Sequence, residues 1–281
     1  MRTFLECIPC FFEQALRAGR LATRDETKIK KILDEVGLML KDISLDSTPP
    51  EIGRLIYQKV HEISGNNDPY KEIKIQNTET ALKLYPTLKD KLRQSGDSLM
   101  TAIRIAIAGN IIDFGARENF DIESELNDIM TKEFAICDYD SFRTLLSQTG
   151  RILYIGDNAG ETVFDRILIE QMAKPTTYIV RESPVINDAT REDAVRAGID
   201  KVAEIISSGT NAPGAILETC NQDFLRLLSQ SGLTISKGQG NYEALSGESY
   251  PIFFMLMAKC PRIAEDIGIH LNDIILKGIN I

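Results

Sequence analysis

Side chains that can hold a divalent cation stand together where a short apolar segment ends. Residues 152–155 are apolar, Gly156 follows them, and Asp157 and Asn158 come next, before a helical pattern begins. In an open α/β sheet, ligands bind just beyond the carboxyl ends of the strands. A carboxylate and a carboxamide at that place offer two hard oxygen donors, which suit Mg²⁺ or Mn²⁺ better than softer metals.

A second carboxylate follows the next predicted strand. Asp188 lies in the loop after 176–180 and directly before a predicted helix at 191–197. Neighbouring strands would bring Asp188 beside Asp157 and Asn158. Three protein oxygens leave room for water and a substrate phosphate oxygen, which is the usual way in which proteins hold Mg²⁺. Ordinary turn chemistry at Asp157 and Asn158 and a helix N-cap at Asp188 explain the same residues equally well.

Two further loops are candidates for the lining of this site. Lys237 follows the predicted strand 233–235 beside glycines, so an anion could approach both its charge and the backbone. In isolation, a solvated lysine in a glycine-rich turn is the simpler explanation. The loop after 202–206 contains Ser208 and Gly209 and offers hydroxyl and backbone N–H groups, or it is only a connector.

Two polar residues interrupt the strongly apolar helix predicted at 99–114. Asn110 and Asp113 are three positions apart, so they face the same way. Buried polar groups need partners. A cleft between the two halves of the chain would provide them, and structural hydrogen bonds would do so equally well.

The cysteine content predicts reduced thiols. The five cysteines are an odd number in a chain without a secretory signal, so a disulfide framework is not expected. Cys7 and Cys10 form a single Cys-x-x-Cys pair, for which zinc would require two more ligands. Cys260 is the one other cysteine in a similar Cys-Pro context. We therefore expect Cys7 and Cys10 to pack in the core on one helix face.

The hydrophobic periodicity changes near the middle of the chain. The first half repeats apolar residues at helical spacing, as at Ile29, Ile32 and Val36. From Arg151 on, short apolar segments alternate with helical ones, which predicts βαβ crossovers and a mainly parallel sheet. The expected strands are 152–155, 176–180, 202–206, 233–235, 252–257 and 274–276. The predicted architecture is α/β, with an N-terminal α-helical domain (1–145) packed on a C-terminal Rossmann-like three-layer α/β/α domain (146–281).

Composition limits the partners. The 281-residue chain is 43% hydrophobic and has a net charge of −9, which argues against broad contact with nucleic acid and leaves room for a small anionic substrate in a locally positive pocket. Its most apolar stretch, 252–258, is too short to span a bilayer. We expect a cytoplasmic protein without nucleic-acid or membrane partners.

Several motifs in order resemble one family. They are Gly-Asp-Asn-Ala-Gly-Glu at 156–161, Asn-Asp-Ala-Thr at 187–190, Lys-Gly-Gln-Gly-Asn-Tyr-Glu at 237–243, Gly-Asn-Ile-Ile-Asp at 109–113, and the early Cys-x-x-Cys. Together they are similar to the damage-control phosphatases, the domain of unknown function eighty-nine, in its compact microbial branch. The resemblance extends over nearly the whole chain.

The resemblance implies a metal-dependent phosphatase acting on small phosphorylated metabolites, such as sugar phosphates or damaged cofactor derivatives. It implies Asp157, Asn158 and Asp188 as ligands of Mg²⁺ or Mn²⁺, with Co²⁺ or Ni²⁺ as further candidates, and Lys237 as the phosphate contact. Further substrate-binding candidates are Glu161, Asn110, Asp113, Ser208 and Gly209. The attacking group is either a water on the metal or the carboxylate of Asp157.

Two other functions stay open at this level. One is an S-adenosylmethionine-dependent carboxyl methyltransferase, although no Gly-x-Gly-x-x-Gly loop follows the first strand of the predicted sheet. The other is a non-catalytic module whose cysteine pair holds zinc. Metal-dependent hydrolysis, S-adenosylmethionine binding and zinc content distinguish the three.

Overall fold

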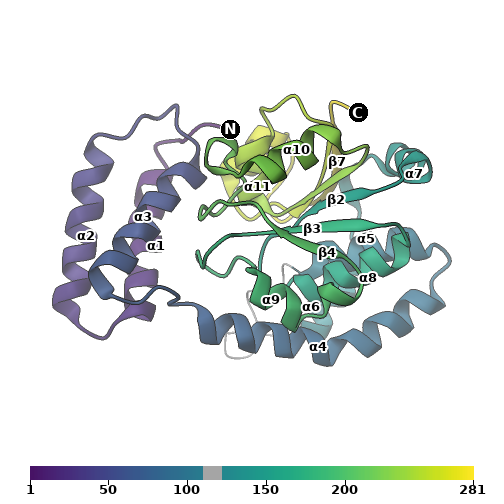
Figure 1. The fold of residues 1–281 in the computed structure, drawn as a ribbon, viewed down its shortest axis with the longest axis horizontal. Helices are drawn as coiled ribbons and strands as arrows, with labels where there is room; N and C mark the ends of the chain where they lie inside the picture. The colour runs from purple at the N-terminus through teal and green to yellow at the C-terminus, as the bar shows by residue number, and fades with distance from the viewer. Residues whose placement is uncertain (110–121) are drawn as a thin grey trace.

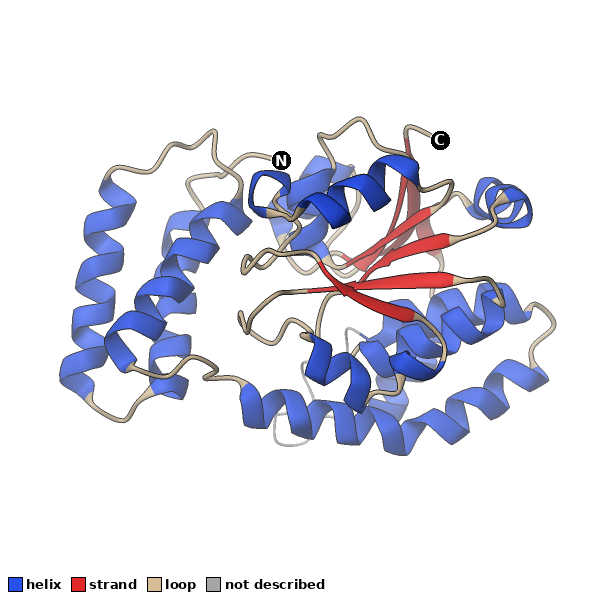
Figure 2. Ribbon diagram, in the orientation of Figure 1, coloured by secondary structure: helices blue, strands red, loops and turns tan. Residues whose placement is uncertain are grey.

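A computed structural model of the chain describes residues 1–109 and 122–281. These residues form a three-layer α/β body and, beside it, a cluster of three helices (Figures 1 and 2). The predicted architecture, helices first and then a mainly parallel α/β sheet, is confirmed.

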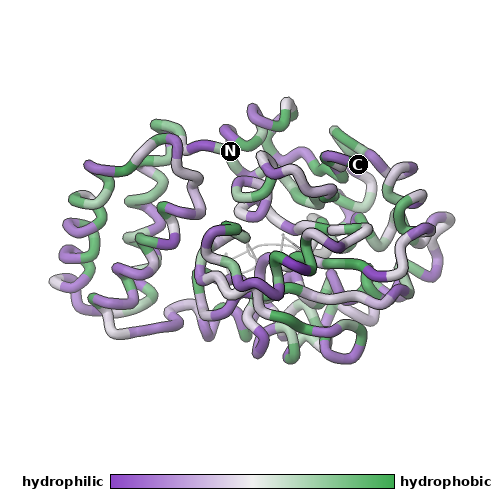
Figure 3. The backbone as a smooth tube through the Cα atoms, turned by 45° about the horizontal axis from the view of Figure 1, so that its top comes forward, coloured by the Kyte–Doolittle hydropathy of each residue, from purple (hydrophilic) through white to green (hydrophobic). Residues whose placement is uncertain are grey.

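The first three helices pack on one another. They are α1 (Cys7–Ala22), α2 (Glu26–Lys41) and α3 (Pro49–Ser64). Asp25 caps α2 through bonds to two backbone N–H groups, and Thr48 and Glu51 form a capping box at α3. Each helix buries one apolar face, with Phe11, Ile32 and Ile56 in the shared core. The tube of α2 accordingly alternates between hydrophobic and hydrophilic in Figure 3.

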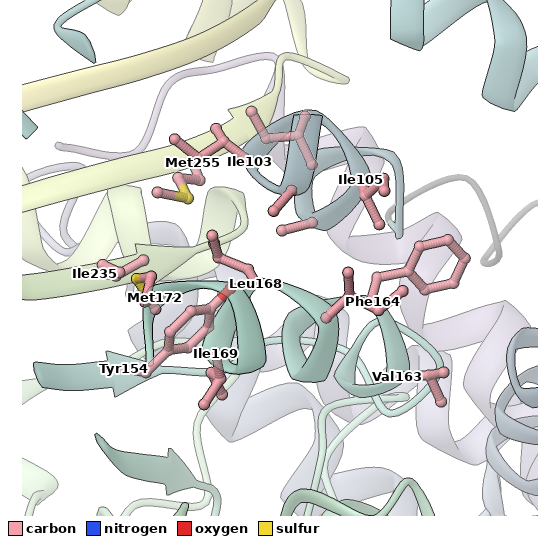
Figure 4. Packing of buried hydrophobic residues seen from close by; sticks show 14 of the residues in the cluster. Ile103, Ile105, Tyr154, Val163, Phe164, Leu168, Ile169, Met172, Ile235 and Met255 are labelled. Carbon is pink, nitrogen blue, oxygen red and sulfur yellow. The ribbon is translucent and has the colours of Figure 1, made fainter. Parts of the chain in front are cut away.

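The next helices cover one face of the sheet. They are α4 (Lys71–Gln94), α5 (Ser98–Ala108), α6 (Ile122–Thr131), α7 (Tyr139–Gln148), α8 (Thr162–Met172) and α9 (Arg191–Arg196). The long α4 leaves the three-helix cluster and runs along this layer (Figure 1). Ile103 of α5 and Leu168 of α8 pack in the same buried cluster as Ile235 and Met255 of the sheet (Figure 4).

The described residues form one seven-stranded sheet. Its strands are β1 (Phe134–Cys137), β2 (Ile152–Ile155), β3 (Thr176–Val180), β4 (Glu204–Ser207), β5 (Thr234–Lys237), β6 (Ile252–Met257) and β7 (Ile274–Ile279). Their order is β1-β7-β6-β5-β2-β3-β4, and β6 and β7 form the antiparallel pair. The central strands β2, β3 and β5 are buried along their length, as expected for parallel strands covered on both faces.

The second face carries the C-terminal helices. They are α10 (Gln222–Gln230), α11 (Gln239–Leu245) and α12 (Pro261–Ile267), with short 3₁₀ segments at Ile199–Lys201 and Leu217–Thr219 elsewhere in the chain. Phe224 of α10, Tyr242 of α11 and Ile263 of α12 pack there against Phe254 of β6. Within the described ranges, no helix has the length and apolar character needed to cross a membrane.

The six predicted strands are present, and β1 is a seventh that the sequence reading missed. The predicted boundary at 145/146 falls inside α7, and β1 before it already belongs to the sheet. The helices also divide differently from the prediction, because α4 and α5 pack on the sheet and α1–α3 form their own core. A division into two domains remains an interpretation.

Candidate functional site

The candidate site lies where the winding of the sheet changes direction. β2 has β3 and then β4 on one side, and β5 and then β6 on the other. The loops after β2 and β5 therefore leave the sheet at a topological switch point, the usual place for a ligand in an open α/β sheet. The loop after β2 carries Asp157 and Asn158, and the end of β5 carries Lys237.

Backbone hydrogen bonds join the loop after β2 to the loop after β3. The N–H of Ala189 donates to the carbonyl of Asp157, and the N–H of Ala159 donates to the carbonyl of Asn187, both at 2.8 Å. This pairing places Asn158 opposite Asp188. The structure thus brings the three candidate ligands Asp157, Asn158 and Asp188 to one place.

Neighbouring side chains fix how these oxygens are presented. The amide nitrogen of Asn158 donates to Glu161 Oε1 at 2.7 Å and to Asp157 Oδ2 at 3.1 Å, so its carbonyl oxygen is the atom that could bind a cation. Arg181 Nε donates to Asp188 Oδ2 at 2.7 Å. Burial raises the pKa of Asp188, and the guanidinium of Arg181 opposes that shift.

The donor set fits a hard divalent cation. It consists of two carboxylates and one carboxamide oxygen, which is the chemistry that Mg²⁺ and Mn²⁺ select. In the described part of the chain, no group of three or more histidine, cysteine, aspartate and glutamate side chains is placed to hold a metal. The set therefore depends on Asn158 together with Asp157 and Asp188.

A glycine makes room for the carboxylate of Asp157. Gly238 has a φ of +78°, a left-handed conformation that side chains rarely adopt. A Cβ atom at this position would lie 1.9 Å from Asp157 Oδ2. The Lys-Gly sequence is thus explained by close approach of the two loops rather than by turn chemistry alone.

Lys237 lies beneath the candidate site in a buried ion-pair network. Its ammonium group donates to Glu161 Oε2 at 3.1 Å, Asp165 Oδ1 at 2.7 Å and the carbonyl of Ala106 at 2.7 Å. Burial alone would lower the pKa of Lys237, but the two carboxylates outweigh it and raise the pKa. All three ammonium protons have acceptors, so the geometry makes Lys237 a support for Glu161, which in turn holds Asn158.

Asp165 is a member of this network that the sequence reading missed. Its carboxylate also accepts hydrogen bonds from the hydroxyls of Tyr154 and Tyr178, each at 2.7 Å. The side chains of Asp165, Tyr154, Tyr178 and Lys237 are fully or almost fully buried. The one signal in the sequence was an acidic residue on the apolar helix after Glu161, which also reads as an ordinary charge near a helix N-terminus.

A cavity of about 710 Å³ opens at the candidate ligands. One wall is the sheet edge with Asp157, Asn158 and Asp188, and the opposite wall comes from α1 and α3. This volume lies within the usual range for small-molecule sites, roughly 300–1,000 Å³. Among the described residues, the lining includes neither Lys237 nor Glu161.

Other predicted site residues lie elsewhere. Ser208 is buried and donates to the carbonyl of Val180, and Gly209 packs against Asn221, so neither of these two candidates belongs to the described cavity lining. Asn110 and Asp113 lie outside the described residues.

The early cysteine pair requires a correction. Cys7 and Cys10 are free thiols, and both line the cavity. Cys7 is half-buried and also packs against the core of the three helices, whereas Cys10 is exposed, so the expected core packing fails for Cys10. The helical spacing indicated correctly that they share one face of α1. That face is turned toward the cavity, whereas Phe11 and Ala15 lie in the shared core of the helices.

The sequence matches the family described as "Damage-control phosphatase ARMT1-like domain" over residues 3–275. A damage-control phosphatase of Pyrococcus horikoshii is 34% identical over 276 residues, covering 96% of this chain and 95% of the relative. One from Archaeoglobus fulgidus is 33% identical, covering 97% and 98%. The crystal structure of a Pyrococcus horikoshii protein of the domain of unknown function eighty-nine is similar with a TM-score of 0.90 at 32% identity, covering 99% of each chain.

Proposed function

The chain belongs to the ARMT1-like family of damage-control phosphatases, and we propose that its phosphatase site is the cavity edge at which Asp157, Asn158 and Asp188 meet. The observation that carries this proposal is the pairing of the two loops, which gathers three oxygen donors at the switch point of the sheet. The substrate is a phosphomonoester of a small metabolite, in keeping with the names of the relatives.

We assign the cation, Mg²⁺ or Mn²⁺, to Asp157, Asn158 and Asp188. When bound, such an ion neutralises phosphoryl charge as the ester bond breaks. The protein's own contribution is orientation. Arg181 holds one carboxylate oxygen of Asp188, and Glu161 holds the amide nitrogen of Asn158.

The same supports offset part of the negative charge near the site. Lys237 pairs with Glu161 and Asp165 below the site, whereas the carboxylates of the candidate ligands Asp157 and Asp188 line the cavity. Asp157 is the candidate nucleophile of the chain itself, and water is the alternative, because each could attack a phosphoryl group held at this edge.

Hydrolysis of an aryl phosphate with Mn²⁺ or Mg²⁺ tests the proposal. We expect Asp157→Ala and Asp188→Ala to lower kcat/KM at least a hundredfold, because each variant removes a ligand. Asp223→Ala is the matched control, since Asp223 is exposed on α10 and pairs with Arg226. It should keep wild-type activity.

A second readout is independent of turnover. Mn²⁺ at about a hundred times its Kd would stabilise the folded state by about 2.7 kcal/mol. We expect the resulting rise in Tm for the wild type and Asp223→Ala, and its loss in Asp157→Ala and Asp188→Ala. Unchanged hydrolysis and an unchanged Mn²⁺ effect in the latter two variants would remove this edge from the mechanism. Binding of S-adenosylmethionine without metal-dependent hydrolysis would favour the methyltransferase.

A further inference from the structure

One face of α1 lines the cavity. Cys7, Cys10, Gln14 and Arg17 follow one another at steps of three and four residues, so they form a single stripe along the helix. All four line the cavity whose opposite wall carries the candidate ligands of the cation. The three-helix cluster therefore contributes one polar wall of the site.

Two members of this stripe bond to each other and to α3. The amide of Gln14 donates to Cys10 Sγ at 3.2 Å and accepts from the hydroxyl of Tyr57 at 3.2 Å. Both ends of this amide are therefore occupied within the wall itself. Arg17, one turn further along, is exposed and has no hydrogen bond or ion pair with any described residue.

Arg17 differs in this respect from the other cations of the cavity lining. Within the described residues these are Lys259 and Arg262. Arg262 pairs with Glu265 at 2.7 Å, and Lys259 has an interaction of its own. Arg17 is thus the guanidinium of the lining that lacks an anionic partner in the part of the chain that the structure describes.

Tyr57 of α3 lies beside this stripe, because its hydroxyl bonds to Gln14. Its side chain is buried and lines the cavity. Burial raises the pKa of Tyr57, Tyr70 and the charge of Asp188 raise it further, and the charge of Arg17 opposes the shift. The hydroxyl of Tyr57 therefore lies within the electrostatic reach of both Asp188 and Arg17.

From this arrangement we infer that Arg17 binds a second acidic group of the substrate, a carboxylate or a second phosphate, while the scissile phosphate lies at Asp157 and Asp188. This inference rests on the proposed function and narrows it to doubly acidic phosphometabolites. A guanidinium presents two parallel N–H donors, a geometry that matches carboxylate and phosphate. A local cation also offsets the repulsion of an anion by a chain with a net charge of −9.

Two substrate pairs test the inference. Glycerol 3-phosphate and 3-phosphoglycerate differ in a carboxylate, and fructose 6-phosphate and fructose 1,6-bisphosphate differ in a second phosphate. The measured quantity is the ratio of kcat/KM for the acidic member over that for the other. We expect the wild type to prefer the acidic member of at least one pair. Arg17→Ala should lower that ratio about tenfold, mainly through KM, and Arg17→Lys should retain part of it.

Arg20→Ala is the matched control, because Arg20 is exposed on the same helix and does not line the described cavity. It should keep the wild-type ratio. Equal ratios in the wild type and Arg17→Ala, or no wild-type preference in either pair, would overturn the inference. If neither pair is hydrolysed, the proposed function is still decided separately by the aryl phosphate assay. In that case the affinities of the same four compounds are measured by calorimetry in the presence of Mn²⁺. The ratio of the affinity for the acidic member of a pair to that for the other member then tests the role of Arg17.

Discussion

The ammonium group of Lys237 is fully buried between two carboxylates that are themselves inaccessible to water. Removing one partner from such a set leaves uncompensated charge in the interior, which costs more than the intact pair contributes. Buried residues beneath the candidate site therefore fix the side chains at its surface. Lys237 and Asp165 keep Glu161 in place, and Glu161 orients the amide of Asn158.

We predict that Lys237→Met lowers the free energy of unfolding by about 3–5 kcal/mol, because Glu161 and Asp165 lose their counter-charge. Urea unfolding at neutral pH measures it. Lys89→Met is the control, since Lys89 is partly exposed and its partner Glu170 keeps a second ion pair with Arg166. That variant should lose less than about 1 kcal/mol. Equal losses in the two variants would contradict a charge-balancing role for Lys237.

The common location of the candidate ligands could be predicted from the sequence, and the residues that support them could not. Asp157, Asn158 and Asp188 follow apolar strand segments, so their common edge follows from the rules for parallel sheets. Asp165 lies inside α8, and only the pairing of β5 beside β2 brings Lys237 to it. Contacts between residues so distant in the chain leave no local pattern.

The turn between β5 and α11 sets the distance between two loops of the site. We predict that Gly238→Ala lowers kcat/KM for an aryl phosphate at least tenfold, because the new Cβ would displace the carboxylate of Asp157. Gly65→Ala is the matched control. Gly65 has the same φ of +78° with no heavy atom within 4 Å of an added Cβ. This control should lose about 1–2 kcal/mol of stability, the cost of the left-handed backbone, and keep its activity.

Steady-state kinetics and urea unfolding on both glycine variants separate backbone strain from displacement of the carboxylate. If both variants lost activity in proportion to their loss of stability, backbone strain alone would explain the effect of Gly238→Ala. In that case the contact between Gly238 and Asp157 would have no role of its own.

Strands buried on both faces of the sheet were predictable, and so was the edge strand β4, but the other edge strand, β1, was not. β2, β3 and β6 appear in the sequence as continuous apolar segments bounded by turns, as parallel or central strands do. β1 has an alternating pattern of half-buried and exposed residues and is four residues long. A segment of only four residues beside charged residues looks like the end of a helix in the sequence, so it does not predict a strand.

The cavity lies between the core of the three-helix cluster and the α/β body, which has one core on each face of its sheet. From the sequence, the first half of the chain was assigned to one helical domain. Hydrophobic periodicity shows which face of a helix is buried, but it does not show which element packs on that face. In the structure, α5 packs with α8 on the sheet, whereas α1–α3 pack with one another. The wall that carries Arg17 therefore belongs to a different core from the edge that carries Asp157.

Glu243 lies at the boundary between these two parts. It belongs to α11, and it lines the cavity opposite α1. Burial raises the pKa of Glu243 to about 8, the amino group of Met1 opposes the shift and Asp266 adds to it. Its charge also raises the pKa of Cys7 on α1, although burial is the larger cause there.

The raised pKa predicts a pH-dependent stability. Below the ordinary glutamate pKa of about 4.5, Glu243 is protonated in both the folded and the unfolded state. In this range its ionisation does not lower the free energy of unfolding. Between about pH 4.5 and 8 the folded state keeps the proton and the unfolded state loses it. The free energy of unfolding therefore falls by up to about 1.4 kcal/mol for each pH unit, because one pKa unit corresponds to that energy.

Urea unfolding at pH 5, 6, 7 and 8 measures this contribution as the difference between the wild type and Glu243→Gln, whose side chain is neutral throughout. We expect the wild type to lose stability relative to Glu243→Gln as the pH rises, by a few kcal/mol in total. Glu62→Gln, at an exposed position on α3, should follow the wild type in parallel. Parallel curves for Glu243→Gln as well would mean that Glu243 is already ionised in the folded protein, so that the boundary between the two parts admits water.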